Sequence, residues 1–211
     1  MMTIEHKKLI EVDLSTPHLR FPREMTSVSE AVYASSFCLL NEVETIEVEE
    51  DNPRYIGRGN CLIDTKTGQL VLGCKNSVIP QDNTVTEIGP LAFNGCQDLN
   101  TLEIPSSVRR LGRMAFAYTG LEELDIPPFV TRIGSLCFAL NPSLHTLRFY
   151  NDVRHLGRAV FGTRGELESA NPQRVPLPDL LFNHVTPDVS HVVRASTLEA
   201  YFHQFDIDYR G

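Results

Sequence analysis

The chain has few of the features that mark enzymes, membrane proteins or nucleic-acid-binding proteins. Among its 211 residues there is no CxxC pair, no HExxH motif and no run of about 20 apolar residues, the length that a helix needs to cross a bilayer. Its 19 Lys and Arg are outnumbered by 27 Asp and Glu, which gives a net charge of −8. Phosphate binding needs an excess of cations. We therefore expect no nucleic-acid partner, no membrane insertion, no metal and no cofactor.

The N-terminal segment also lacks an uninterrupted apolar stretch of secretory length. The sequence as written therefore predicts a cytoplasmic protein. A secreted or cell-surface location is the alternative if the sequence is a trimmed piece of a longer one. With 42% apolar side chains the chain can bury a substantial core, and one domain is the natural expectation.

The chain contains four copies of a nine-residue motif with the pattern Val-x-x-Ile/Leu-Gly-x-x-x-Phe. The copies lie at residues 85–93, 108–116, 130–138 and 153–161, so that they recur every 22 or 23 residues. A fixed period of this length is typical of a solenoid, in which each unit buries its apolar face against its neighbours. The pattern predicts that the repeated Phe is a core residue rather than part of a ligand-stacking stripe.

Apolar residues follow the repeated Phe at fixed offsets and alternate with polar ones, which is the period of a half-buried strand. The same spacing after Phe37 adds a degenerate fifth unit upstream. The repeated Gly and the piece between it and the Phe predict a tight bend followed by a single helical turn.

One period is longer than the others because residues 53–79 carry an insertion with a predicted hairpin about the turn at 66–69. We expect an N-terminal cap at 1–27, repeats at 28–166 and a C-terminal cap at 167–211, where a helix begins with a Ser-x-x-Glu capping box. Cys61 and Cys74 flank the hairpin. They are interpreted as two reduced packing cysteines, with a disulfide as the alternative.

These residues resemble the BspA-type (treponemal-type) leucine-rich repeat family, whose unit looks like Val-x-x-Ile-Gly-x-x-Ala-Phe-x-x-Cys-x-x-Leu-x-x-Leu-x-Ile-Pro. Residues 85–105 match it at almost every apolar position, including Cys96, and the insertion and residues 192–201 also resemble segments of that family. The resemblance implies an α/β repeat solenoid: a β-rich right-handed leucine-rich-repeat superhelix of about five units, with a β-hairpin insertion and terminal caps. It also implies a bacterial protein of the adhesin or host-contact type, although this chain has few repeats and no visible export signal.

The variable positions of the units are the candidate binding residues, since equivalent positions of adjacent units stack about 5 Å apart. They are predicted to form one acidic and one basic surface, unless they are simply solvated and charge-mixed to prevent further stacking. The acidic set lies on the predicted strands and consists of Glu47, Glu103, Glu123 and Asp125. The basic set lies on or next to the Val-x-x-Ile-Gly segments and consists of Arg109, Arg110, Arg113, Arg132, Arg154 and Arg158.

The function predicted from these features is a non-enzymatic interaction module that binds a protein or an acidic glycan. An intracellular scaffold or an accessory subunit of an enzyme is the alternative. A hydrolase using His184 or His191 is disfavoured, because no pair of nucleophile and base can be named. Gly57-Arg-Gly59 is interpreted as a turn, since a dinucleotide-binding loop would lead into a helix.

Overall fold

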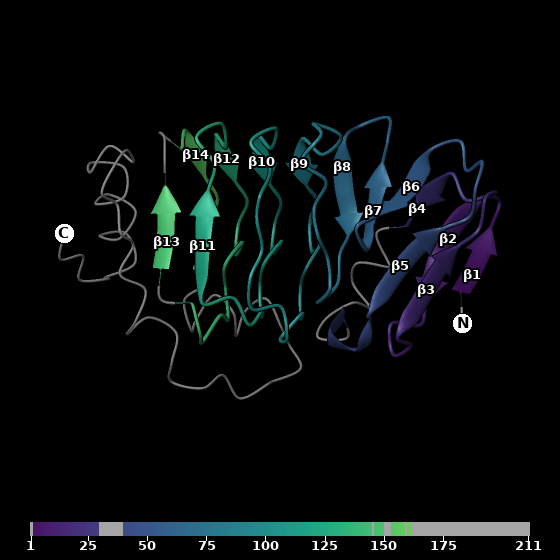
Figure 1. Cartoon of the computed structure of the whole chain (residues 1–211), viewed down its shortest axis with the longest axis horizontal. Coiled ribbons are helices and arrows are strands. Elements are labelled where there is room, and N and C mark those ends of the chain that lie inside the picture. Colours follow the sequence, from purple (N-terminus) through teal and green to yellow (C-terminus); the bar gives the residue numbers. More distant parts are fainter. Residues whose placement is uncertain (1, 30–39, 145, 150–152, 159, 162–211) are drawn as a thin grey trace.

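The structure is a computed structural model that describes residues 2–29, 40–144, 146–149, 153–158 and 160–161 (Figure 1). It is a β-solenoid, in which successive units of the chain stack side by side along the long axis of the molecule. The only helix in these ranges is one 3-10 turn, η1 (Leu40–Glu42). The expected repeat solenoid is thus confirmed, with almost no helical component.

One side of the solenoid is a seven-stranded sheet with the order β14-β12-β10-β9-β8-β7-β6. Its strands are β6 (Tyr55–Arg58), β7 (Cys61–Asp64), β8 (Gln69–Leu72), β9 (Glu87–Ile88), β10 (Arg110–Leu111), β12 (Arg132–Ile133) and β14 (His155–Leu156). From β8 to β14 the neighbours are parallel, one strand from each unit, whereas β6, β7 and β8 form an antiparallel meander. The predicted hairpin is therefore present, and β8 joins it to the repeats.

The opposite side, which faces the viewer in Figure 1, carries two separate pairs of parallel strands. These are β3 (His18–Phe21) with β5 (Thr45–Val48), and β11 (Glu123–Ile126) with β13 (Thr146–Phe149). We call this side the strand face. The remaining strands, β1 (Met2–Glu5), β2 (Lys8–Val12) and β4 (Ser27–Val28), form a small sheet at the N-terminal end.

Residues 99–104 do not form the strand that their alternating pattern predicted. Leu99 and Ile104 are buried as expected, with 1% and 5% of their surface exposed. No backbone hydrogen bond in the described part of the chain joins residues 101–104 to a neighbouring unit. The side chains thus follow the repeat pattern without the backbone pairing that defines a strand.

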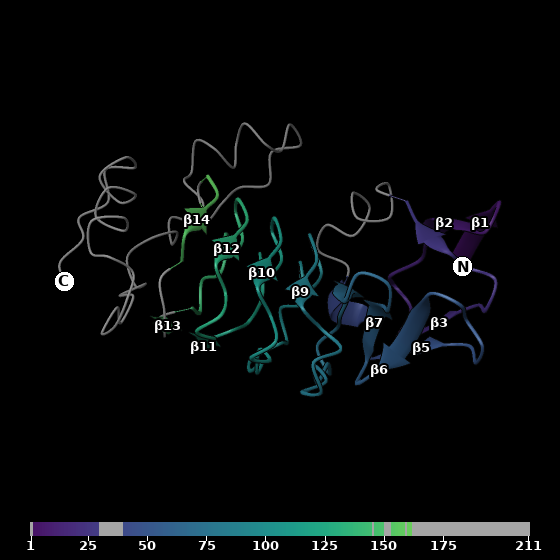
Figure 2. The ribbon, with the colours of Figure 1, turned by 90° about the horizontal axis from the view of Figure 1, so that it is seen from above.

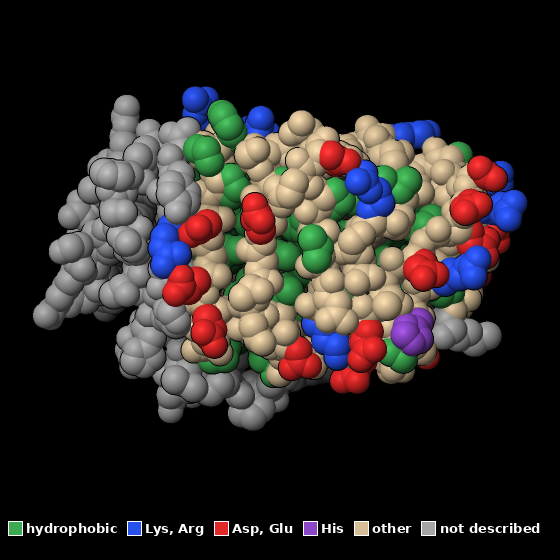
Figure 3. Space-filling view, viewed as in Figure 1, with side chains coloured by type: hydrophobic (Ala, Val, Ile, Leu, Met, Phe, Trp, Pro, Cys, Tyr) green, Lys and Arg blue, Asp and Glu red, His purple; other side chains and the backbone are tan. Residues whose placement is uncertain are grey.

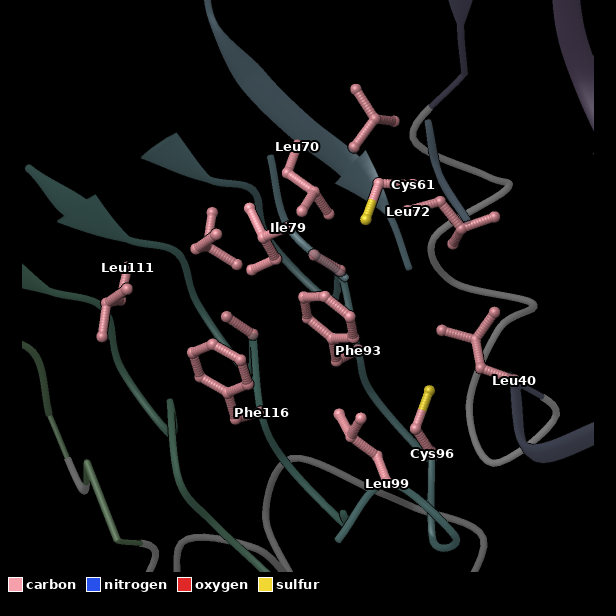
Figure 4. Close-up of a cluster of buried hydrophobic side chains, with 14 of the residues drawn as sticks. Leu40, Cys61, Leu70, Leu72, Ile79, Phe93, Cys96, Leu99, Leu111 and Phe116 are labelled. Atoms are coloured by element: carbon pink, nitrogen blue, oxygen red, sulfur yellow. The ribbon is translucent and has the colours of Figure 1, made fainter. Parts of the chain in front are cut away.

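The repeated Phe side chains form the centre of the core. The rings of Phe93, Phe116, Phe138 and Phe161 stack in sequence, with centroids 5.5, 5.8 and 6.0 Å apart. Figure 4 shows two of them among the aliphatic and Cys side chains of adjacent units. The first three rings are at most 2% exposed, which confirms that the Phe ladder is structural.

The chain reaches each Phe through a turn rather than the predicted helical turn. The residue two positions before each of the first three rings, namely Leu91, Met114 and Leu136, has φ between 53° and 59°. A left-handed residue cannot belong to a right-handed helical turn. Backbone bonds between units hold the turn instead, as when the N–H of Phe93 donates to the carbonyl of Ala115 at 2.9 Å.

The insertion fastens the N-terminal segment to the repeats. Arg54 donates to the Asp64 carboxylate through Nε and Nη2, at 2.9 and 2.7 Å, and to the carbonyl of Thr26 at 2.9 Å. Asp64 is only 4% exposed. Burial alone raises the pKa of Asp64, but the hydrogen bonds from Arg54 and the Lys66 N–H, with the charge of Arg54, outweigh it and hold the pKa below its usual value.

Several features predicted from the sequence lie outside the described residues. They are Phe37 of the degenerate unit, the C-terminal cap at 167–211, and both candidate histidines, His184 and His191.

Candidate binding surfaces

A depression of about 720 Å³ opens on the strand face. We call it the strand-face groove, and it is lined by residues 77–79, Gln81, 101–104, 123–125, Pro127, Pro128 and Arg148. Acidic side chains lie over this face of the molecule in Figure 3. The groove brings together three of the four predicted acidic residues, Glu103, Glu123 and Asp125, whereas Glu47 lies on β5 and does not line it.

The strand β11 presents its acidic residues because its side chains alternate. Leu124 and Ile126 point into the core at 2% and 1% exposure, so Glu123 and Asp125 face outward. Arg148 on β13 bridges the two carboxylates, with Nη2 2.6 Å from Glu123 Oε2 and Nη1 3.2 Å from Asp125 Oδ1. The hydrogen bond to Glu123 and then that to Asp125 raise the pKa of Arg148.

Glu103 is the acidic residue of the groove that has no ion pair within the described ranges. It is exposed on the unit before β11, between the partly buried Leu102 and the buried Ile104. Val78, which lines the same groove, is 72% exposed, although most Val side chains are largely buried. The groove therefore combines a carboxylate that is open to solvent with apolar surface. Val78 could not be found from the repeat pattern, because the insertion interrupts the repeat there.

The opposite side of the solenoid carries the basic set, which we call the arginine face. The register of the seven-stranded sheet aligns Glu87, Arg110, Arg132 and His155 on neighbouring strands, as the repeat spacing predicts. Strand neighbours lie about 4.8 Å apart, so these positions form a continuous column.

Some members of the arginine face already have partners. Arg110 Nε lies 3.1 Å from Glu87 Oε2, and the guanidinium of Arg109 stacks on the ring of Phe129 at 4.6 Å from its centroid. Arg113, Arg132 and Arg154 are exposed and form no ion pair with another described residue. The role of Phe129 was not foreseen, since it follows two prolines outside the repeat pattern.

The cysteines are packed in the core rather than poised for chemistry. Cys61, Cys74, Cys96 and Cys137 are free thiols, each fully buried. Burial raises the pKa of Cys61 to about 12 and raises those of the other three. Cys61 and Cys74 are thus two free packing cysteines, as interpreted from the sequence, and not the alternative disulfide. They are not cross-strand partners, because the ladder between β7 and β8 runs from Asp64 with Gln69 to Leu62 with Leu72 and includes neither cysteine.

The described ranges hold no group of three or more His, Cys, Asp or Glu that could bind a metal ion. Gly57 and Arg58 belong to β6, and Gly59 lies in the turn before β7, so the segment leads into a strand rather than a helix. Within these ranges no helix has the length and apolar character of a transmembrane span.

The stacked units and their exposed columns define a repeat protein with a β-solenoid scaffold. Six copies of the BspA-type leucine-rich repeat match residues 71–175, so this region belongs to the BspA-type leucine-rich repeat family. The match confirms the resemblance found in the sequence, and its six copies compare with the five units expected. No curated protein matches the chain.

Solved structures of bacterial leucine-rich repeat proteins are similar to this chain. A leucine-rich repeat protein from Eubacterium ventriosum has 25% identity and a TM-score of 0.51, over 64% of this chain and 37% of its own. The pneumococcal vaccine antigen PcpA has 18% identity and a TM-score of 0.45, and the match covers 67% of this chain and 42% of the antigen. A leucine-rich cell surface protein from Faecalibacterium prausnitzii has 17% identity and a TM-score of 0.44, and the match covers 76% of this chain and 52% of that protein. This chain thus matches about half or less of each of these proteins.

Proposed function

We propose that this chain is a non-enzymatic interaction module that binds a protein partner through the strand-face groove. The observation that carries the proposal is the groove itself, where exposed carboxylates and the exposed Val78 lie together on a rigid scaffold. Binding sites combine apolar surface with a few charged groups that fix orientation. Leucine-rich repeat proteins of this fold are typically interaction modules, which supports the same function.

A role as an adhesin or host-contact factor is the specific form of this function that we favour. It follows from the family rather than from a residue of this chain, and an intracellular scaffold or accessory subunit remains the alternative. The cytoplasmic location predicted from the sequence also stays a prediction. Fractionation of the native organism, with an antibody against this chain, would separate surface display from a cytoplasmic scaffold.

The binding test uses two sets of charge reversals. One variant carries Glu103→Lys with Asp125→Lys in the groove, and the other carries Arg110→Glu, Arg132→Glu and Arg154→Glu on the arginine face. Immobilised wild-type chain is screened against purified host matrix proteins and glycans. We expect a protein ligand whose binding is lost in the groove variant and kept in the other. A ligand that binds both variants as it binds the wild type would contradict the proposal.

The arginine face supports a second candidate function, the binding of an acidic glycan. Arg132 and Arg154 come from adjacent units and have no acidic partner among the described residues. An extended polyanion could follow such a column from unit to unit. Retention on immobilised heparin that falls with salt, and that disappears in the Arg110, Arg132 and Arg154 variant but not in the groove variant, is the expected result. Equal retention of both variants would rule this candidate out.

A further inference from the structure

β11 lies in the strand-face groove beside residues 101–104 of the preceding unit. It pairs with β13 in a two-stranded sheet, and no other strand of the described residues pairs with it. The two units are hydrogen-bonded before and after these segments, where the Gly120 N–H donates to the Cys96 carbonyl at 3.2 Å and the Thr131 N–H donates to the Arg109 carbonyl at 3.0 Å. A ligand in the groove therefore contacts the outward-facing side chains of the two units and does not enter between them.

The charges along the groove are spaced as an extended ligand would require. Glu123 and Asp125 are two residues apart on β11, and side chains two residues apart in a strand point to the same face. Glu103 extends the acidic surface to the preceding unit. Among the described residues that line the groove, Arg148 is the one Lys or Arg, beside Glu103, Glu123 and Asp125, so this lining has an excess of negative charge.

Arg148 shows how this surface receives a cation. It reaches from the adjacent strand and contacts Glu123 at 2.6 Å and Asp125 at 3.2 Å, with 38% of its own side chain still exposed. Glu103 has no such partner in the described part of the chain. A basic side chain from a bound segment can do at Glu103 what Arg148 does on β11, and the 72% exposed Val78 offers a contact for an aliphatic side chain beside it.

On the basis of the proposed function, we propose that the groove takes an extended basic segment of the partner protein, in which Arg or Lys alternates with aliphatic residues. The cationic side chains face Glu103 and the exposed carboxylate oxygens on β11. The aliphatic side chains contact Val78. One exposed pair of opposite charges on neighbouring extended segments contributes little, so several such pairs acting together give the selectivity.

The test uses a short fluorescent peptide of alternating Arg and Val, with a peptide of alternating Glu and Val as the reference. Binding is followed by fluorescence anisotropy at about 0.05 M and about 0.5 M salt, since screening weakens exposed charge pairs. We expect wild-type chain to prefer the Arg peptide at least about tenfold at low salt. An equal affinity for the two peptides would overturn the proposal.

Two single variants separate the groove from the overall negative charge of the chain. Glu103→Gln should weaken binding of the Arg peptide several-fold, whereas Glu122→Gln, which removes one charge at an exposed position outside the groove, should leave it nearly unchanged. Arg148→Ala frees two carboxylates and should tighten binding several-fold. Equal effects of the two Gln variants, or weaker binding by a folded Arg148→Ala chain, would contradict the groove assignment.

Failure of this inference can be told apart from failure of the proposed function. A protein ligand that is lost in the groove variant, together with an equal affinity for the two peptides, would keep the groove as the binding site and overturn only the basic segment as its ligand. A protein ligand that is lost only in the arginine-face variant would overturn the groove and the proposed function together. A dimer, seen by light scattering and abolished by Val78→Asp, would assign the groove to a second copy of this chain and equally overturn the proposal.

Discussion

The repeated Gly is required by the neighbouring unit rather than by its own backbone. A Cβ atom built on Gly112 would lie 2.5 Å from the N of Pro90, and one built on Gly134 would lie 2.5 Å from the N of Arg113. Both contacts are to backbone, which cannot move aside as a flexible side chain can. The glycine therefore sets how closely two units approach, and the tight bend predicted from the sequence is not its main reason.

Gly112→Ala should lower the free energy of unfolding by about 1 to 3 kcal/mol, because the added methyl group forces two units apart. Chemical denaturation monitored by circular dichroism measures the change. Ser106→Ala, at an exposed position of the same unit, is the control and should change little. A loss no larger than that of the control would show that the units can separate freely.

Asn94 is a buried polar residue at a position where the next two units have alanine. Its side chain is 1% exposed, and neither its Oδ1 nor its Nδ2 has a hydrogen-bond partner among the described residues. The next two units have Ala117 and Ala139 at the same position after the Phe. An unsatisfied buried amide lowers stability.

Asn94→Ala should therefore raise the free energy of unfolding by about 1 to 2 kcal/mol, which would be visible as a higher midpoint of thermal unfolding. Asn141→Ala is the opposite control. The Asn141 amide donates to the carbonyl of Phe116 at 2.7 Å and accepts from the N–H of Thr119 at 2.6 Å, so its loss should destabilise the chain. A destabilised Asn94→Ala chain would indicate that its amide has a partner.

Among the elements, the insertion has the clearest role beyond its own strands. The meander β6-β7-β8 continues the parallel sheet of the repeats, and Arg54 and Asn52 bond the segment before it to residues 22–26. The pair of Arg54 and Asp64 is the ionisable part of this joint. Its contribution should consequently depend on pH.

Because the pKa of Asp64 is lower in the folded state than the usual 3.8, its ion pair stabilises the fold above that value. The stabilisation should be lost as the pH falls below about 4 toward the lowered folded pKa. Asp64→Asn should lower the free energy of unfolding by about 1 to 3 kcal/mol at neutral pH, with a smaller further loss in acid than the wild type.

Denaturation midpoints measured between neutral and acidic pH provide the test, with Glu50→Gln, an exposed position, as the control. Parallel pH profiles for the wild type and Asp64→Asn would exclude Asp64 as a source of the acid dependence.

At the scale of the whole molecule, the Phe ladder couples the units, so that we expect them to unfold cooperatively. Each ring stacks on the next at 5.5 to 6.0 Å, so a cavity in one unit also removes contacts from its neighbours. The buried hydrophobic cluster extends from the N-terminal strands to the last described unit.

Phe116→Ala, in the middle of the ladder, should lower the free energy of unfolding by about 3 to 5 kcal/mol. Phe129→Ala provides a matched control, since that ring is 51% exposed and contacts Arg109 on the surface. We expect its effect to stay below about 1 kcal/mol. A shift of only a degree or two in the unfolding midpoint of Phe116→Ala would contradict the core placement.

The parts of the fold that the sequence predicts are those repeated in every unit. Burial of the Phe column and alignment of Arg110 with Arg132 follow from the spacing, because stacking forces equivalent positions together. The missing strand at 99–104 depends on backbone pairing with another unit, which no local pattern encodes. The bridge from Arg148 to Glu123 depends on side-chain conformation. The exposure of Val78 depends on the insertion, which has no repeat pattern. The columns of both candidate surfaces were thus predictable, whereas the groove was not.

The register of the parallel sheet also bears on how such a chain can change during evolution. Each unit contacts chiefly the units on either side, and each carries its own Phe, Gly and strand positions. Removal of residues 94–116 would join Phe93 to Ala117 and leave Phe93 in place to stack on Phe138. Descendants of one ancestral gene can therefore differ in length by whole units without a new core, while the exposed positions of each unit diverge independently toward different ligands.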